Sequence, residues 1–308
     1  MLIIKGHRSQ IRDLIFITDG MAVASIAGKG YAISLWEATT GERRSYLSAG
    51  YEDTVTSICA HPNGEDLYAC QRWSGLRIWN LKTEKVTNVN RCRSIYSHYD
   101  QILISHDGEQ CFLVPEPSWY GLVSHVYIFD LVGKKANLRT HQLASFGAEY
   151  GTGSCRSLSL SPNKKLFAAS VQSRKETRAR VLKLSGPPLP ESSMDLGEGR
   201  AVAFSPDGKW LAVAVDSHIN LHSTNNWEIA TTFHGHTERV NHLAFSPDGA
   251  KLVSGGDDST VRMWELATES EERHFDWGIG QISRVAFAPD GMRAAAGGQR
   301  QIVIWDVD

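Results

Sequence analysis

The sequence predicts an all-β chain that closes into a ring of seven small sheets. One sequence repeat recurs along the chain. It consists of a strand, the turn Ser-Pro-Asp-Gly, a second strand, and a third strand ending at Trp-Asp or a related pair. The turn residue recurs every 41 to 56 positions, at Asp19, Asn63, Asp107, Asn163, Asp207, Asp248 and Asp290. The position held by Trp in the best copies also recurs seven times, at Trp36, Trp79, Phe129, Leu182, His222, Trp264 and Trp305. Seven copies with periods mostly of about 40 to 45 residues and four strands each are typical of β-propeller blades.

The strands within a copy are predicted from side-chain alternation and from the turn. The run Val-Arg-Met-Trp at 261–264 alternates apolar and polar side chains, as a strand with one buried face does. In the turn, Pro presets its backbone angle, Asp can bond the neighbouring backbone, and Gly accepts a positive φ. No long stretch has helical periodicity.

These residues make the chain resemble the WD-repeat family of β-propellers. The matching residues are Gly235-His236, Ser254, Asp258, Trp264-Glu265 and Trp305-Asp306. The resemblance extends over residues 2–307, is strongest in copies six and seven, and is weakest in copies three and four. The tidy Phe-Ser-Pro-Asp-Gly copies are similar to those of bacterial members. The family implies a toroid of four-stranded blades that acts as a binding platform.

The two ends of the chain predict how the ring closes. Residues 2–7 align with residues 231–236, which form the outer strand of copy five and the loop into copy six. The chain stops just after the third strand of its last copy. We therefore expect residues 2–5 to complete the last blade, which also removes an open sheet edge. No Ser/Gly/Pro linker interrupts the copies, so residues 1–308 are expected to form one domain.

Composition argues against several classes of protein. The net charge of −2 gives no bulk attraction to nucleic acid or to an anionic membrane. The five cysteines form no C-x-x-C pair and are odd in number, which favours reduced thiols in a cytoplasm. Neither a leader pattern nor a run of 18 apolar residues is present, so we expect no membrane partner.

No motif predicts a cofactor, a metal or a catalytic residue. The sequence lacks G-x-x-x-x-G-K-[ST], G-x-G-x-x-G, G-x-S-x-G and H-E-x-x-H, and its twelve histidines are scattered without metal-ligand spacing. Cys59 stands where other copies have Ser or Ala in the innermost strand, which favours a packing role over a reactive thiol.

His236, Ser254, Asp258 and Trp264 match the structural tetrad of the family. A buried Trp needs an acceptor for its indole N–H, Ser can supply it, His can bond the Ser, and Asp can fix the His. A catalytic Ser-His-Asp set is the alternative. Ten residues before the Trp position, other copies have Ile26, Ala69, Ala212 and Ala295, and Gly30 precedes Trp36 by six. Only blade six is therefore expected to carry all four members.

Three insertions, at residues 115–125, 144–154 and 172–180, break the period in copies three and four. We expect them to share the top face with a loop of blade two. Their aromatic and basic residues, of types that anchor interfaces, are Trp73, Trp119, Tyr120, Tyr150, Arg174 and Arg178. The alternative is that these residues have no binding role, with the aromatic rings packed on their own blade and the basic side chains in a solvated turn.

The first residues of the inner strands predict a second candidate site. One aligned position holds Arg12, Thr56, Asp100, Arg156, Arg200, Asn241 and Ser283. Three arginines against one aspartate would give the channel mouth a cationic rim that favours a carboxylate or phosphorylated ligand. The alternative is that these arginines pair with neighbouring carboxylates.

Together these observations predict a non-catalytic scaffold that binds a protein or peptide, possibly an acidic one. The binding surface would be the top-face loops of blades two to four, the channel mouth, or both. We expect a monomer or a subunit of a hetero-complex. An enzyme, or a binder of small acidic ligands at the channel mouth, is the other hypothesis, since fold alone does not decide function.

Overall fold

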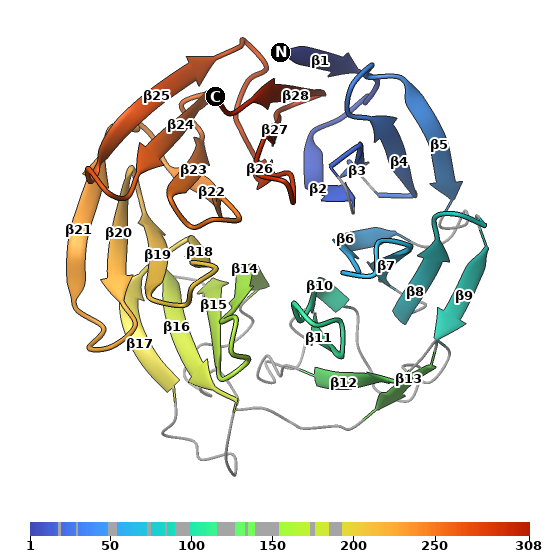
Figure 1. Ribbon diagram of the computed structural model, residues 1–308, viewed down its shortest axis with the longest axis horizontal. Coiled ribbons are helices and arrows are strands. Elements are labelled where there is room, and N and C mark those ends of the chain that lie inside the picture. The colour runs from blue at the N-terminus through green and yellow to red at the C-terminus, as the bar shows by residue number, and fades with distance from the viewer. Residues whose placement is uncertain are drawn as a thin grey trace.

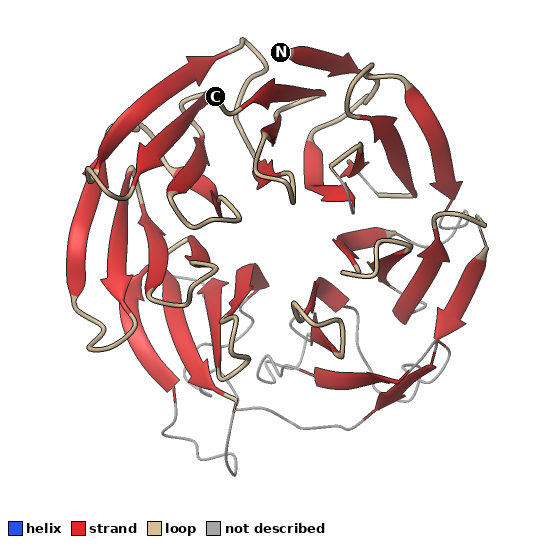
Figure 2. Ribbon diagram, viewed as in Figure 1, coloured by secondary structure: helices blue, strands red, loops and turns tan. Residues whose placement is uncertain are grey.

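The chain forms seven four-stranded sheets arranged as blades around a central channel (Figure 1). The computed structural model describes residues 1–17, 20–28, 30–48, 54–72, 75–83, 85–89, 99–115, 127–132, 135–138, 154–172, 176–184 and 193–308. In this part of the chain Figure 2 shows strands and loops and no helix. The prediction of an all-β, seven-bladed propeller is confirmed.

In blades one to six, four consecutive strands run from the channel outward. Blades one and two contain β2 (Ile11–Ile17), β3 (Ala22–Ala27), β4 (Ala32–Glu37), β5 (Arg43–Ser48), β6 (Val55–Ala60), β7 (Asp66–Gln71), β8 (Gly75–Asn80) and β9 (Val86–Val89). Blades three and four contain β10 (Tyr99–Ile104), β11 (Gln110–Pro115), β12 (Tyr127–Val132), β13 (Lys135–Leu138), β14 (Ser154–Leu160), β15 (Leu166–Gln172), β16 (Thr177–Lys183) and β17 (Ser193–Glu198). Blades five and six contain β18 (Ala201–Phe204), β19 (Trp210–Val215), β20 (His218–Ser223), β21 (Ile229–His234), β22 (Val240–Phe245), β23 (Lys251–Gly256), β24 (Thr260–Glu265) and β25 (Ser270–Asp276).

The Ser-Pro-Asp-Gly turns join the first two strands of a blade through one set of hydrogen bonds. In blade six, Ser246 Oγ donates to Asp248 Oδ1 at 2.6 Å and accepts the N–H of Lys251 at 2.9 Å. Asp248 Oδ1 also accepts the N–H of Ala250 at 3.0 Å, and Gly249 adopts a φ of 73°. Blade five has the same three bonds. The turn sequence recurs because its side chains satisfy the turn's own backbone.

Blade seven is completed by a strand from the other end of the chain. Its sheet has the order β1-β28-β27-β26, with β26 (Arg284–Phe287), β27 (Arg293–Gly297), β28 (Gln301–Asp306) and β1 (Leu2–Lys5). The register of β1 on β28 runs from Leu2 opposite Ile304 to Lys5 opposite Gln301. Ile4 is 2% exposed and packs with Trp36 and Ile302. Closure of the ring by the N-terminal strand is thus confirmed, and Figure 1 shows the two termini close together.

Side chains of one inner strand bind the backbone of the next inner strand around the channel. Ser157 Oγ accepts the N–H of Val202 at 3.1 Å, and Ser159 Oγ accepts the N–H of Phe204 at 2.8 Å. Asp13 Oδ2 accepts the N–H of Ile58 at 3.0 Å between blades one and two. Each inner strand ends its sheet and has no further strand on its channel side. These bonds satisfy groups on that edge and fix one blade against the next.

Removal of residues 1–5 is predicted to lower the melting temperature of the whole protein, because the last blade loses its outer strand. Ile4→Ala tests the same contact more gently and should cost about 2–5 kcal/mol of unfolding free energy. Ile3→Ala, on the same strand but 37% exposed, is the control and should change stability by about 0.5 kcal/mol at most. Chemical unfolding measures both. Equal losses, or a shortened protein that melts normally, would contradict the closure role.

Candidate functional site

Four side chains of blade six form a continuous hydrogen-bond chain. His236 Nδ1 lies 2.8 Å from Asp258 Oδ2, and His236 Nε2 lies 2.8 Å from Ser254 Oγ. Ser254 Oγ accepts the indole N–H of Trp264 at 2.9 Å. Ser254 is fully buried and Trp264 is 1% exposed. The network supplies partners to polar groups that burial would otherwise leave unsatisfied.

The same geometry argues against a catalytic triad. Ser254 Oγ is inaccessible and already holds the Trp264 N–H, so no substrate carbonyl can reach it. Burial acts to raise the pKa of Asp258, but hydrogen bonds from His236 and Thr260 outweigh it and hold that pKa well below its usual range. The charged carboxylate fixes the His236 ring and accepts the N–H of Thr237 at 3.0 Å. These contacts tie the loop before β22 to the β23–β24 hairpin.

Blade one carries a second network, which counting along the sequence missed. His7 Nε2 lies 2.8 Å from Ser25 Oγ, and Ser25 Oγ accepts the indole N–H of Trp36 at 2.8 Å. The His7 ring meets the Trp36 ring edge-on, with centroids 5.4 Å apart. The expectation that Ile26 replaces the serine of blade one is therefore wrong.

The error comes from counting across a hairpin whose length varies. In both blades the serine lies two residues after the residue paired with the tryptophan, which is Val23 for Trp36 and Leu252 for Trp264. This cross-strand register is constant, whereas blade one has one residue more between its serine and its tryptophan. The spacing from histidine to serine is 18 in both networks and would have identified Ser25.

The same register corrects two further positions. It places Val213 rather than Ala212 at the serine position of blade five, and Ala296 rather than Ala295 in blade seven. Ala69 in blade two agrees with the prediction. Counted from Ser25, the place of Asp258 falls on Lys29 rather than Gly30. Lys29 lies outside the described residues.

Blade seven replaces hydrogen bonds with aromatic packing. Trp305 is 4% exposed, and its Nε1 has no hydrogen-bond partner in the described structure. Ala296 at the serine position offers no acceptor. Trp277 instead packs at a tilt against Trp305 with centroids 4.9 Å apart, and Phe275 stacks on Trp277 at 5.0 Å.

The residues predicted at the channel mouth share one structural position, the start of each inner strand. In five blades the pairing of the inner strand shifts register there, as at a β-bulge, at Arg12, Thr56, Asp100, Arg156 and Asn241. In blade five, the N–H of Arg200 donates to the carbonyl of Ala214, the residue that pairs with Ala201. In blade seven, the N–H of Ser283 donates to the carbonyl of Gly297, the residue that pairs with Arg284. Bulges at such rims re-aim side chains away from the regular ladder.

Two neutral members of this position, Asn241 and Ser283, bind the next blade. Asn241 Nδ2 donates to the carbonyl of Ile282 at 3.0 Å, and Ser283 Oγ donates to the carbonyl of Ile11 at 2.6 Å. These two side chains therefore hold adjacent blades together.

The arginines of this position are more accessible. Arg12 and Arg156 are exposed and Arg200 is half-buried. Arg156 Nε donates to Gln172 Oε1 at 2.6 Å. Neither Arg12 nor Arg200 forms an ion pair with any residue that the structure describes. The neighbouring carboxylate of Asp13 is occupied by Arg284 Nε at 3.4 Å, Ser57 Oγ at 2.9 Å and the N–H of Ile58.

Most of the predicted top-face residues lie outside the described residues, namely Trp73, Trp119, Tyr120, Tyr150 and Arg174. Arg178 lies in β16 and is held within blade four. Its Nε donates to Asp195 Oδ2 at 2.8 Å and its Nη1 to Glu176 Oε1 at 3.2 Å. Two carboxylates thus already engage the Arg178 guanidinium.

Comparison with known families agrees with this architecture. The model of the WD domain, G-beta repeat, matches residues 200–223, 227–265 and 273–306, which cover blades five to seven. These blades share their strand order with the four preceding ones. Blades five to seven are WD repeats, and the whole chain is a seven-bladed β-propeller.

Several curated WD-repeat relatives resemble parts of this propeller. An uncharacterized WD repeat-containing protein of Synechocystis is 43% identical over 22% of this chain and 20% of its own length. The target of rapamycin complex subunit wat1 of Schizosaccharomyces pombe is 36% identical over 24% of each chain. WD repeat-containing protein 1-B of Xenopus laevis is 24% identical over 86% of this chain and 41% of its own length. The alignments span about a quarter or less of the first two relatives and under half of the third.

Two features are absent from the described part of the chain. No three His, Cys, Asp or Glu side chains there are grouped as metal ligands would be. No helix there has the length and apolarity needed to cross a membrane.

Burial raises the pKa of the Cys59 thiol to about 12, so this cysteine is protonated near neutral pH.

The two buried tryptophans of blades six and seven form a matched pair for measuring the network. Trp264→Phe is predicted to destabilise the protein by about 1–3 kcal/mol more than Trp305→Phe. Both changes remove similar ring area, but only the first removes a hydrogen bond and leaves Ser254 short of a partner. Urea unfolding of the two variants gives the comparison. Equal losses would show that the hydrogen bond adds nothing measurable.

Proposed function

We propose that this WD-repeat propeller is a non-catalytic scaffold that binds an acidic protein segment at the mouth of its channel. WD-repeat proteins generally serve as scaffolds for protein interactions, and the name of one relative describes a subunit of a complex. The observation that carries the proposal is the position shared by Arg12, Arg156 and Arg200. The equivalent positions of these three arginines at the starts of inner strands support a common rim.

Charge and access support an acidic ligand. Guanidinium groups bind carboxylates bidentately, and no described residue forms an ion pair with Arg12 or Arg200. Asp13 is committed to Arg284 and to blade two, and Asp257 accepts a hydrogen bond from Asn241 Nδ2 at 2.7 Å. An acidic segment would therefore meet Arg12 and Arg200 without displacing an ion pair to any residue that the structure describes.

The rigidity of the rim favours binding over acid–base chemistry. Its polar neighbours are tied to the next blade by hydrogen bonds, as Asn241 and Ser283 are. The described side chains at this rim position are arginines and neutral residues, and the adjacent Asp13 and Asp257 carboxylates already accept hydrogen bonds, which disfavours a role as proton acceptor. The top-face loops with Trp119 and Tyr120 are proposed as a second part of the same binding surface.

Substitution of Arg12, Arg156 and Arg200 by Ala together is predicted to weaken binding of an acetylated, amidated poly-glutamate peptide about tenfold or more. Calorimetry at low and moderate salt measures the affinity, which should also fall with ionic strength. The control substitutes Arg44, Arg273 and Arg300, three exposed arginines that the shared rim position does not include. Binding that survives the first triple variant, or that falls equally in the control, would remove the channel mouth from consideration.

A further inference from the structure

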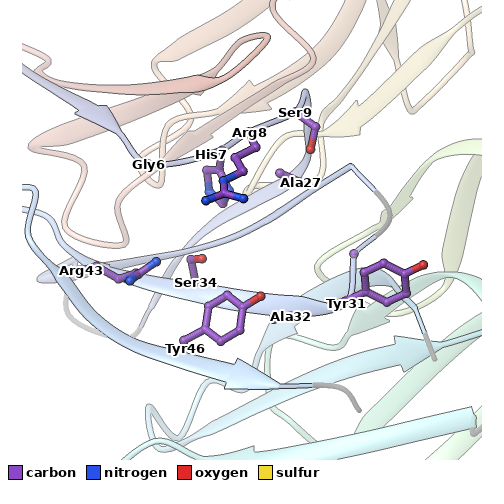
Figure 3. Close-up of a pocket in the computed structure, with 11 residues that line it drawn as sticks. Gly6, His7, Arg8, Ser9, Ala27, Tyr31, Ala32, Ser34, Arg43 and Tyr46 are labelled. Atoms are coloured by element: carbon purple, nitrogen blue, oxygen red, sulfur yellow. The ribbon is translucent and has the colours of Figure 1, made fainter. Parts of the chain in front are cut away.

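A pocket of about 650 Å³ opens in blade one beside the network that lacks its fourth member (Figure 3). Figure 3 shows His7 and Arg8, from the segment after β1, facing the strands that carry Ser34, Arg43 and Tyr46. Tyr31 lines the pocket from the residue just before β4. The volume lies within the range of small-ligand pockets, roughly 300–1,000 Å³.

His7 presents one ring nitrogen without a partner. In blade six, His236 uses Nε2 for Ser254 and Nδ1 for the Asp258 carboxylate. In blade one, Nε2 is used for Ser25, while Nδ1 has no hydrogen bond to any residue that the structure describes. Ser25 Oγ accepts the indole N–H of Trp36, which favours donation of its own hydrogen to Nε2. That tautomer leaves a hydrogen on Nδ1 to be donated.

The described charge around this nitrogen is positive. Arg8 and Arg43 are exposed, and no described carboxylate pairs with either. The described residues that line the pocket include no Asp or Glu. Burial and the charge of Arg43 lower the pKa of His7 to about 4, so its imidazole is neutral near pH 7. By contrast the adjacent Arg44 pairs with Glu37 at 3.7 Å and does not line the pocket.

The pocket also offers aromatic surface. Tyr31 is 46% exposed and Tyr46 is 59% exposed, and the Arg43 guanidinium lies over the Tyr46 ring at 5.8 Å. A ligand with an anionic head and an apolar body would contact both kinds of surface.

We propose that this pocket binds a carboxylate, which accepts the Nδ1 hydrogen of His7 and pairs with Arg43 and Arg8. The ligand would take in blade one the place that Asp258 has in blade six. The carboxylate could belong to an acidic side chain of a partner protein or to a free organic acid. This site goes beyond the scaffold function proposed above, because it lies in blade one among the β3–β4 hairpin and the outer strands, apart from the channel mouth.

The test follows the ring nitrogens of His7 by NMR in protein labelled with ¹⁵N-histidine. Benzoate serves as the free acid, and an acetylated, amidated glycine peptide with one central glutamate serves as the partner segment. The signals are assigned by their absence from His7→Gln. We expect a saturable shift of the His7 signals with at least one probe. Arg43→Gln and Arg8→Gln should each weaken the affinity about tenfold, because each removes a charge-assisted hydrogen bond.

Arg44→Gln is the matched control and should bind as the unchanged protein does. Saturation by the peptide alone assigns the site to a partner segment, and saturation by benzoate alone assigns it to a free acid. The absence of any saturable shift, or an affinity unaffected by Arg43→Gln, would overturn the proposal. The triple variant of Arg12, Arg156 and Arg200 separates this site from the channel mouth. This triple variant should still show the saturable shift of the His7 signals. Loss of that shift in the triple variant would also overturn the proposal.

Discussion

The pairing of β1 with β28 is the constraint on which the rest of this propeller depends. Every other blade is built from consecutive strands, so its sheet forms from local hairpins. Blade seven alone joins residues from the two ends of the chain. Loop-closure entropy grows slowly with length, by about 0.6 kcal/mol for each doubling, so four backbone pairs and the buried Ile4 can offset it. Closure removes the exposed edge that an incomplete blade would present to other chains.

Blades one, six and seven share a backbone and differ in how they satisfy one buried tryptophan. Blade six uses a charged aspartate, a histidine and a serine, whereas blade one uses a histidine and a serine. In blade seven no described residue accepts the indole N–H, and a second tryptophan packs at a tilt against the ring instead. The glycine before each histidine follows from this packing, since a Cβ at Gly6 would overlap the Trp36 ring. Local polar chemistry therefore varies freely where the hydrophobic frame is kept.

Much of this architecture could be predicted because it depends on periodicity. Seven turn residues and seven tryptophan positions established the number of blades, and the alignment of residues 2–7 with 231–236 predicted the closing strand. The aligned starts of the inner strands also correspond to one position, which the structure identifies as a register shift. Both inferences compare whole copies, and an error of one residue does not change them.

The network of blade one could not be found by that route. A count from Trp36 back to its serine passes through a hairpin, and one extra residue there moves the result to Ile26. The pairing across the strands is constant but visible only with coordinates, and the constant sequence signal is the spacing of 18 residues from histidine to serine, which a count from the tryptophan does not use. The pocket was invisible for a related reason. It consists of side chains from the N-terminal segment and from three parts of blade one, and no motif links them.

His7 and Arg8 follow the closing strand by only two and three residues. The segment that seals the ring therefore also supplies one wall of the blade-one pocket. Release of β1 from β28 would move His7 and Arg8 away from the pocket. A ligand bound to these two residues would therefore also hold β1 on β28. By linkage, a bound ligand raises the free energy needed to open the ring. Opening of the ring lowers the affinity for the ligand by the same factor.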